Sequence, residues 1–252
     1  MKRIIFGVGL SGCCFLAVGA MSRGAAAAAG DLSLHNAAKV GDVQMIQRLL
    51  KAGVDINGAT QEGYTALHLA VENRRGEVIR LLLENGANHA LGDCNGQTPL
   101  HYAARSGLVG AVLLLIRAGA QINAKTKDGS TPLHYAVWEE KIGVMEALLK
   151  AAWKARIAII DEPDKYGYTA LHLAAFLNKQ VIIELLIRFG ANRDLKTSQG
   201  EGVEDVMKRG HYSPLPSPGI PRDSYQHSSP RAAKGSPGAA GQFSQALRSP
   251  PR

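Results

Sequence analysis

Five histidines recur along this chain at an almost constant spacing, and histidine is a residue type that can bind a metal ion or transfer a proton. They are separated by 33, 33, 33 and 38 residues: His35, His68, His101, His134 and His172. If this spacing reflects stacked repeats, equivalent residues lie about 10 Å apart, which is too far for two of them to hold one ion. The sequence also supplies no cysteine at a metal-ligand spacing from them. We therefore interpret the histidines as structural residues.

The residues around these histidines repeat as well. The same six-residue pattern, TALHLA or TPLHYA, stands at 65–70, 98–103, 131–136 and 169–174, and a fainter copy, LHNAA, stands at 34–38. A pattern that returns at such a fixed period indicates a stack of structural repeats. Repeat proteins of this kind usually present an extended surface to a partner. The spacing therefore predicts both a fold and a general kind of function.

Each repeat contains the start and stop residues of two helices. A threonine precedes the first helix and can accept a hydrogen bond from an unpaired backbone N–H. Pro99 and Pro132 follow it, at a position where a missing N–H is harmless. A second, more apolar helix ends at a glycine, the residue type that readily adopts the left-handed conformation found at helix ends. An X-Gly pair before the next threonine is typical of a tight hairpin turn. The helix-ending glycines are Gly53, Gly86, Gly119 and Gly190.

These motifs resemble the ankyrin repeat family, whose unit is a hairpin followed by two antiparallel helices with a Thr-Pro-Leu-His-x-Ala pattern. The resemblance covers about residues 31–211 and implies an all-α fold, an ankyrin-repeat solenoid of stacked helix-turn-helix units with β-hairpin loops. We expect an N-terminal capping unit at 31–61, four full repeats at 62–196 and a truncated C-terminal cap at 197–211, because terminal repeats meet water on one side. The resemblance also implies that the motif histidines hydrogen-bond backbone groups of adjacent hairpins.

Motifs and charge argue against catalysis and against nucleic-acid binding. The sequence contains no nucleophile elbow, glycine-rich phosphate loop, paired carboxylates or zinc-binding helix motif, so we expect a protein that is not an enzyme and uses no cofactor or metal. The net charge of +8 comes mainly from the ends, since residues 31–195 carry 18 basic and 17 acidic side chains. Without a clustered basic face, the array is not expected to bind nucleic acid.

Residues 1–30 differ from the array. Two basic residues precede an uncharged apolar stretch at 4–22, which is typical of a secretory signal that is cleaved after Ala20. Two alternatives use the same residues: a lipobox-like sequence would leave a lipidated Cys13, and an uncleaved stretch could anchor the chain in a membrane. We expect export, periplasmic or secreted, or membrane anchoring. A cytoplasmic location is expected if this segment is a misread start rather than a working signal.

Residues 212–252 form a tail that is rich in proline, serine and glycine and poor in large apolar side chains, a composition that predicts disorder. Ser-Pro occurs five times in this tail, and a weak PxxP pattern lies at 218–221. Such a segment could be a proline-rich ligand or a substrate for phosphorylation. The simpler interpretation, which we favour, is a solvated tail.

One repeat is irregular, because the last gap between histidines has five extra residues and Ala152 replaces the helix-ending glycine. We expect the second helix of this repeat to continue through 151–158 and to end before Pro163, which cannot continue a helix. The segment 150–163 would then project from the stack and offer Trp153 to a partner as an anchor. A neutral surface insertion is the alternative.

In the ankyrin repeat family, partners mostly contact the hairpin tips and the exposed end of the first helix, on the concave side. Counted from the motif histidines, the first half of this surface is charged in this chain. The second half is aromatic, because Trp138 and Phe176 each stand four residues after a motif histidine. Clustered exposed aromatic side chains are typical of an interface centre, although both rings could instead pack inward. The predicted partner-binding residues are Tyr64, Glu72, Gln97, Arg105, Trp138, Glu139, Trp153, Tyr166, Tyr168, Phe176 and Leu177.

The sequence therefore predicts a monomeric, non-catalytic protein–protein interaction module that binds a partner protein on its concave surface. Two alternatives stay open at this point. The chain could be a membrane-anchored tether in which the array is a spacer, or an inhibitor that inserts its segment 150–163 into an enzyme.

Overall fold

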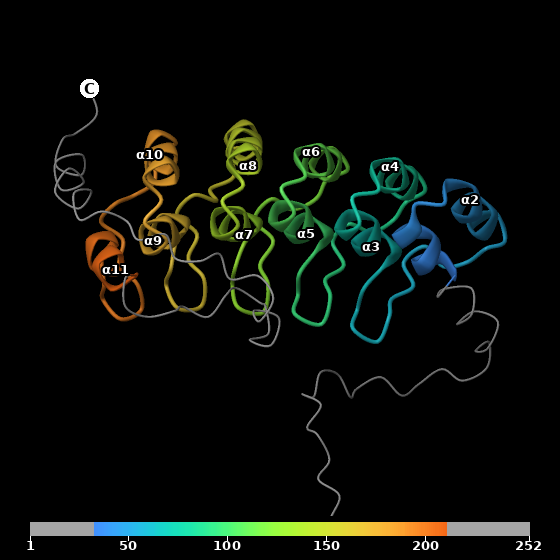
Figure 1. The fold of residues 1–252 in the computed structure, drawn as a ribbon, viewed down its shortest axis with the longest axis horizontal. Helices are drawn as coiled ribbons and strands as arrows, with labels where there is room; N and C mark the ends of the chain where they lie inside the picture. The colour runs from blue at the N-terminus through green and yellow to red at the C-terminus, as the bar shows by residue number, and fades with distance from the viewer. Residues whose placement is uncertain (1–32, 211–252) are drawn as a thin grey trace, which may run out of the picture. The chain divides into compact units, whose positions relative to one another are not determined.

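The computed structural model describes residues 33–210, which fold as pairs of antiparallel helices stacked side by side (Figure 1). Short inner helices and longer outer helices form two rows, and the loops between successive pairs extend beyond the inner row. Within these residues no strand is present, and the hairpins contain only an isolated β-bridge between Ala59 and Thr65. The predicted all-α solenoid of helix-turn-helix units is confirmed.

The two rows are named by their helices. The inner row consists of α3 (Ala66–Glu72), α5 (Pro99–Arg105), α7 (Pro132–Trp138), α9 (Ala170–Phe176) and α11 (Val203–Gly210). The outer row consists of α2 (Val43–Lys51), α4 (Gly76–Glu84), α6 (Val109–Arg117), α8 (Ile142–Ala155) and α10 (Gln180–Arg188). A helix at 33–40 precedes α2.

Each motif histidine of the inner helices joins its own repeat to the next hairpin. In α7, His134 accepts a hydrogen bond at Nδ1 from the backbone N–H of Thr131 (3.1 Å). Because Nδ1 accepts, Nε2 carries the proton and donates to the carbonyl oxygen of Tyr168 in the following hairpin (2.9 Å). The same pair of contacts is made by His68, His101 and His172. The structural role that the resemblance implied for the histidines is confirmed.

Successive hairpins are also linked directly through their turns. The backbone N–H of Lys165 donates to the carbonyl oxygen of Asp128, and that of Ser198 donates to the carbonyl oxygen of Tyr166, each at 2.9 Å. This close approach requires glycine at the turn. Gly167 has a φ of 82°, and a Cβ there would lie 2.4 Å from the backbone nitrogen of Ser198. The turn glycines therefore set the distance between neighbouring hairpins.

The core lies between the two rows of helices. Inner helices bury leucine and alanine side chains such as Leu133 and Ala136, and outer helices bury residues such as Val112 and Leu148. The outer helices α4, α6, α8 and α10 each contact the inner helix of their own repeat, and each inner helix from α3 to α9 contacts the next inner helix, so the apolar layer continues from one repeat to the next. Since full burial of a large apolar side chain contributes about 1.5–3 kcal/mol, this layer is the main source of stability.

Helix α8 is longer than the other outer helices, as predicted, but it ends at Ala155 rather than continuing through residue 158. Arg156 adopts a left-handed conformation, with a φ of 56°, and the chain then turns to bury Ile159, which is 2% exposed. An α-helix does not continue through a left-handed residue. The helix ends before Pro163, as predicted, but the predicted continuation through residue 158 was wrong, because the return of Ile159 to the core ends the helix earlier.

Both ends of the chain lie outside the described residues. This applies to the predicted signal or anchor at 1–30, with its apolar stretch 4–22 and Cys13, and to the predicted tail at 212–252. Within residues 33–210, every helix is too short or too polar to span a bilayer. What the sequence indicated about the two ends stays a prediction.

Candidate functional site

The histidines of α3, α5, α7 and α9 are neutral structural groups rather than reactive ones. Burial lowers the pKa of His101 and of His134 to about 4, from an ordinary value of 6.5. Burial also lowers the pKa of His68 and of His172. In each of these four residues both ring nitrogens contact neighbouring backbone or threonine groups, which leaves neither nitrogen for a substrate. Within 33–210, no group of three or more His, Cys, Asp or Glu side chains is arranged to hold a metal ion.

One equivalent position forms a row along the inner helices. Glu72, Arg105, Trp138 and Phe176 are the last residues of α3, α5, α7 and α9. Arg105 lies 3.8 Å from Glu72 in a partly exposed ion pair. The rings of Trp138 and Phe176 are stacked, with centroids 6.4 Å apart and planes inclined by 12°. The row therefore contains a charged pair followed by an aromatic pair, and both aromatic side chains are partly exposed.

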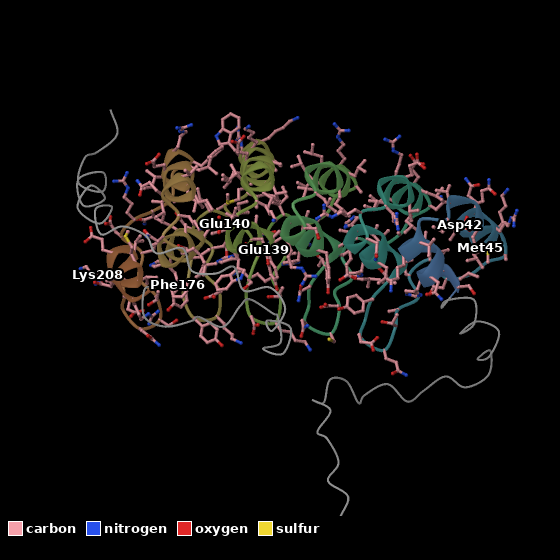
Figure 2. All side chains as sticks on the ribbon, in the orientation of Figure 1. Asp42, Met45, Glu139, Glu140, Phe176 and Lys208 are labelled. Carbon is pink, nitrogen blue, oxygen red and sulfur yellow. The ribbon has the colours of Figure 1, made fainter. Side chains whose placement is uncertain are left out.

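The aromatic pair is bordered by acidic and apolar side chains. Glu139 and Leu177 follow the two rings in the chain, and both are partly exposed. Glu140 is exposed and forms an ion pair with Lys179 at 2.7 Å, which links two successive repeats. Figure 2 shows Phe176 with Glu139 and Glu140 in this part of the array. Among the described residues Glu139 forms no ion pair, so its negative charge lies unpaired beside the rings.

Tyr166 is exposed but does not belong to the same cluster. It lies on a hairpin turn before α9, whereas Phe176 is the last residue of that helix, and a helix of 7 residues rises about 10 Å. Its ring instead lies under the ammonium group of Lys165, with Nζ 4.9 Å from the ring centre. Lys165 also forms an ion pair with Asp128 of the preceding hairpin. The predicted aromatic surface is thus divided between the hairpin tip and the helix ends.

Two predicted contact residues pack in the interior instead, and a third is partly buried. Gln97 and Tyr168 are 2% and 6% exposed, and the Tyr168 hydroxyl accepts a hydrogen bond from Arg209 of α11. Tyr64 is partly buried, and Tyr64 and Tyr168 each pack edge-on against the histidine of their own motif with centroids 6.2 Å apart. The residue after each turn glycine directs its side chain inward, because the chain enters the next inner helix at this point. We therefore leave Gln97 and Tyr168 out of the contact surface.

Trp153 lies on the outer row, away from the inner helices. It belongs to the last turn of α8 and is 83% exposed. The sequence identified it as exposed, and the structure separates it from the Trp138 and Phe176 pair, which belongs to α7 and α9 (Figure 1). The predicted partner-binding residues therefore occupy two different faces of the array.

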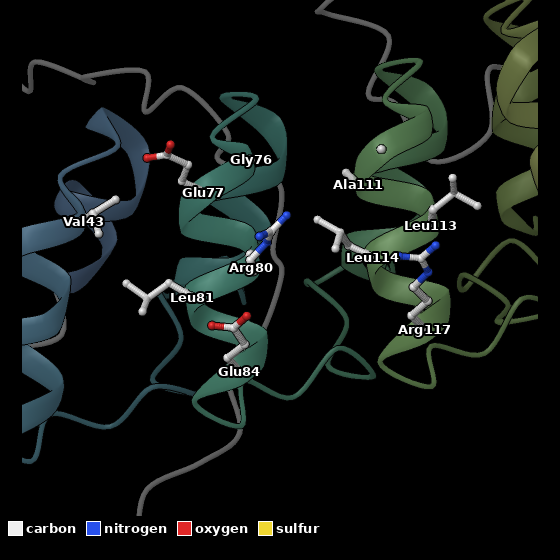
Figure 3. A pocket seen from close by; sticks show the side chains of 11 residues that line it. Val43, Gly76, Glu77, Arg80, Leu81, Glu84, Ala111, Leu113, Leu114 and Arg117 are labelled. Atoms are coloured by element: carbon white, nitrogen blue, oxygen red, sulfur yellow. The ribbon is translucent and has the colours of Figure 1, made fainter.

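A groove that the sequence did not reveal lies between α4 and α6 (Figure 3). It has a volume of about 830 Å³ and is lined by the apolar side chains of Leu81 and Leu114 and by the charged side chains of Arg80 and Arg117. Gly76 also lines it and leaves open space where a Cβ would point. The glycine at the start of this outer helix was a sequence signal for the groove. A glycine there leaves a groove only if the neighbouring helix does not pack closely against it, and the sequence does not reveal that distance.

The fold and the exposed row define a helical repeat protein that presents side chains for binding. The family model described as Ankyrin repeats (3 copies) matches residues 17–93, 34–126, 87–161 and 119–198, which together span more than half of the chain. The chain therefore belongs to the ankyrin repeat family. Ankyrin repeats are generally protein–protein interaction modules, and the family is generally non-catalytic. No match was found among curated proteins.

Proposed function

We propose that this protein binds a partner protein on the face formed by its inner helices, with the stacked rings of Trp138 and Phe176 at the centre. The observation that supports this proposal is the pair itself. Two partly exposed rings are stacked where the preceding repeats carry the ion pair between Glu72 and Arg105. Aromatic side chains are enriched at the centres of protein interfaces, and charged side chains are depleted there. The aromatic half of the row is therefore the better centre for an interface.

The surroundings of the rings indicate which partner chemistry fits. Glu139 adds a negative charge and Leu177 adds apolar surface. A partner segment that combines an apolar side chain with an arginine matches both, because a guanidinium group can pair with a carboxylate and lie over an aromatic ring. The array contains this arrangement within itself, since the guanidinium carbon of Arg105 lies 4.6 Å from the centre of the Tyr102 ring.

The test replaces both rings in the full-length chain, as Trp138→Ala with Phe176→Ala. We expect this variant to lose the partner proteins that the unchanged protein captures from its native source. The matched control, Glu72→Ala with Arg105→Ala, alters the charged pair of the same row and should retain most of the capture. Circular dichroism should show that all three proteins are folded at the temperature of the assay.

Two results would contradict the proposed surface. One is unchanged capture by the folded aromatic variant. The other is a melting temperature lowered by more than about 15 °C, because about 1 kcal/mol shifts the melting of a domain of this size by only about 2–4 °C. Such a loss would mean that Trp138 and Phe176 are core residues rather than surface residues.

The location of the protein is a separate proposal, which rests on the uncharged apolar stretch at 4–22. We propose export or membrane anchoring, and N-terminal sequencing of the mature protein distinguishes cleavage after Ala20, lipidation of Cys13 and retention. A tether would stay in the membrane pellet after a high-salt wash, and a released binding module would not. If the protein were instead an inhibitor, deletion of five residues within 150–163 should abolish inhibition.

A further inference from the structure

Trp153 is the most exposed large apolar side chain of residues 33–210, at 83%. It lies on the last turn of α8, in a part of the helix that the other outer helices lack, since each of those spans 9 residues and α8 spans 14. The extra turn places a tryptophan on the outer row of the array, where water surrounds most of the ring. A side chain of this size contributes little to folding in such a position, so the ring remains available for binding.

Basic side chains lie close to this tryptophan in the chain. Lys150 and Lys154 are both exposed. Lys150 lies on the same helix face as Trp153, three residues before it, whereas Lys154 follows it directly and points about 100° round the helix. Lys150 forms an ion pair with Glu146 at 2.8 Å. Within the described part of the chain, Lys154 and Arg156 form no ion pair, so two positive charges next to the ring remain uncompensated.

Arg156 adds a further basic side chain to this turn, at the residue that follows the helix. This residue has a φ of 56°, in the left-handed region. The outer helices α2, α4, α6 and α10 are each followed by a glycine at positive φ, the residue type that adopts this conformation without strain. An arginine here is less favourable for folding than glycine. Arg74, Glu140 and Asn178 also have a positive φ, so the conformation alone does not identify a binding residue, but it places the exposed Arg156 directly after the helix end that carries Trp153.

We propose that this basic aromatic turn, made of Lys150, Trp153, Lys154 and Arg156, docks the array onto an anionic phospholipid surface. Tryptophan is enriched at the boundary between lipid tails and headgroups, and lysine and arginine bind the phosphates around it. Lysine is depleted in protein–protein interfaces, so two lysines flanking the tryptophan favour a lipid surface over a protein partner.

This inference goes beyond the proposed protein interface and uses a different face. Trp138 and Phe176 end the inner helices α7 and α9, whereas the basic aromatic turn ends the outer helix α8 (Figure 1). The two faces belong to different rows of helices. The array could therefore hold a partner protein while its outer row rests on a membrane.

Intrinsic fluorescence tests the inference directly, because the chain contains only two tryptophans. In the full-length variant Trp138→Phe, Trp153 is the single tryptophan. Vesicles of equal parts phosphatidylcholine and phosphatidylglycerol should shift its emission to shorter wavelength, and lipids brominated on their tails should quench it. Vesicles of phosphatidylcholine alone should have little effect. Vesicle binding without a change in Trp153 emission would overturn the proposal, because another segment, such as 4–22, would then carry the binding.

Variants measured by vesicle co-sedimentation give the magnitudes. Trp153→Ala should weaken binding to the anionic vesicles about tenfold, and Lys154→Ala and Arg156→Gly should each weaken it about fivefold. The matched control is Val181→Ala, which removes another exposed apolar side chain, 63% exposed, from the neighbouring helix α10 and should leave binding unchanged. All four side chains are exposed, so each variant is expected to fold.

The remaining outcomes overturn the inference. If Val181→Ala weakens binding as much as Trp153→Ala, the vesicles bind exposed apolar surface in general. If the protein binds immobilised polyglutamate but not anionic vesicles, the turn recognises an acidic protein surface instead. Neither result bears on the inner face, because the variants at Trp138 and Phe176 test that face by partner capture.

Discussion

The neutral, buried histidines make the stability of the array depend on acid in a predictable direction. Burial lowers the pKa of His101 and of His134 to about 4 in the folded chain, whereas an unfolded histidine titrates near 6.5. As the pH falls below about 6.5, the unfolded chain takes up protons that the folded chain excludes. The contribution is therefore fully present above the unfolded pKa and is lost progressively as the pH falls toward 4.

The size of the effect follows from the two pKa values. Between about pH 7 and about pH 5, each of these two histidines removes about 2 kcal/mol from the free energy of unfolding, so together they remove about 4 kcal/mol. His68 and His172 act in the same direction, because burial lowers the pKa of each. Asp164 acts in the opposite direction at lower pH, because burial raises the pKa of its carboxyl group. Above about pH 5, the change in the free energy of unfolding with pH therefore reports on the histidines.

Urea unfolding followed by circular dichroism, repeated across this pH range, measures the effect. The variant His134→Gln removes one of the titrating groups, so its free energy of unfolding should fall less steeply with acid than that of the unchanged protein, by about one proton near pH 5. The matched control is Val137→Ala in the same helix, a buried residue without a titrating group. It should lower stability and keep the original pH dependence.

One result would refute this reasoning. If the unchanged protein and His134→Gln lose stability in parallel as the pH falls, the acid sensitivity does not come from the buried histidines. In that case the carboxylates or the net charge would be responsible, and the assignment of a neutral ring that accepts at Nδ1 and donates at Nε2 would be incorrect.

Three further predictions concern the stability of the array, each measured by urea unfolding. Gly167→Ala should destabilise by more than about 2 kcal/mol, because it combines an unfavourable positive φ with a clash against the next hairpin; Gly190→Ala, where a Cβ meets nothing, should destabilise less. Arg156→Gly should stabilise by about 1 kcal/mol, because glycine adopts the left-handed conformation without strain. Tyr102→Phe should destabilise by about 1–3 kcal/mol, because the Tyr102 hydroxyl donates to the buried carboxylate of Asp93 at 2.7 Å.

Much of the fold could be predicted from the sequence because its signals are local. The threonine caps, the turn glycines and the fixed period act over a few residues, and they placed the inner helices and the row at Glu72, Arg105, Trp138 and Phe176. The end of α8 could not be predicted in this way. It depends on the burial of Ile159 against the rest of the repeat, which no local pattern encodes.

The candidate surface likewise combines features that local sequence signals predict with features that depend on tertiary packing. Side-chain direction next to a hairpin depends on what the neighbouring repeat supplies, so Gln97 and Tyr168 look like surface positions in the sequence but are buried. The stacking of Trp138 on Phe176 is likewise a contact between residues 38 positions apart. Only the distance between repeats decides whether two such rings meet.

By itself the sequence determined that the chain repeats, that each unit is a pair of helices, and that the histidines are structural, because each of these depends on local capping residues and a constant period. The tertiary structure decided which side chains remain available for binding. It paired two aromatic rings on the inner row and left one tryptophan among basic residues on the outer row. Exposure depends on the packing of neighbouring repeats, and that packing is a property of the stack rather than of any one repeat.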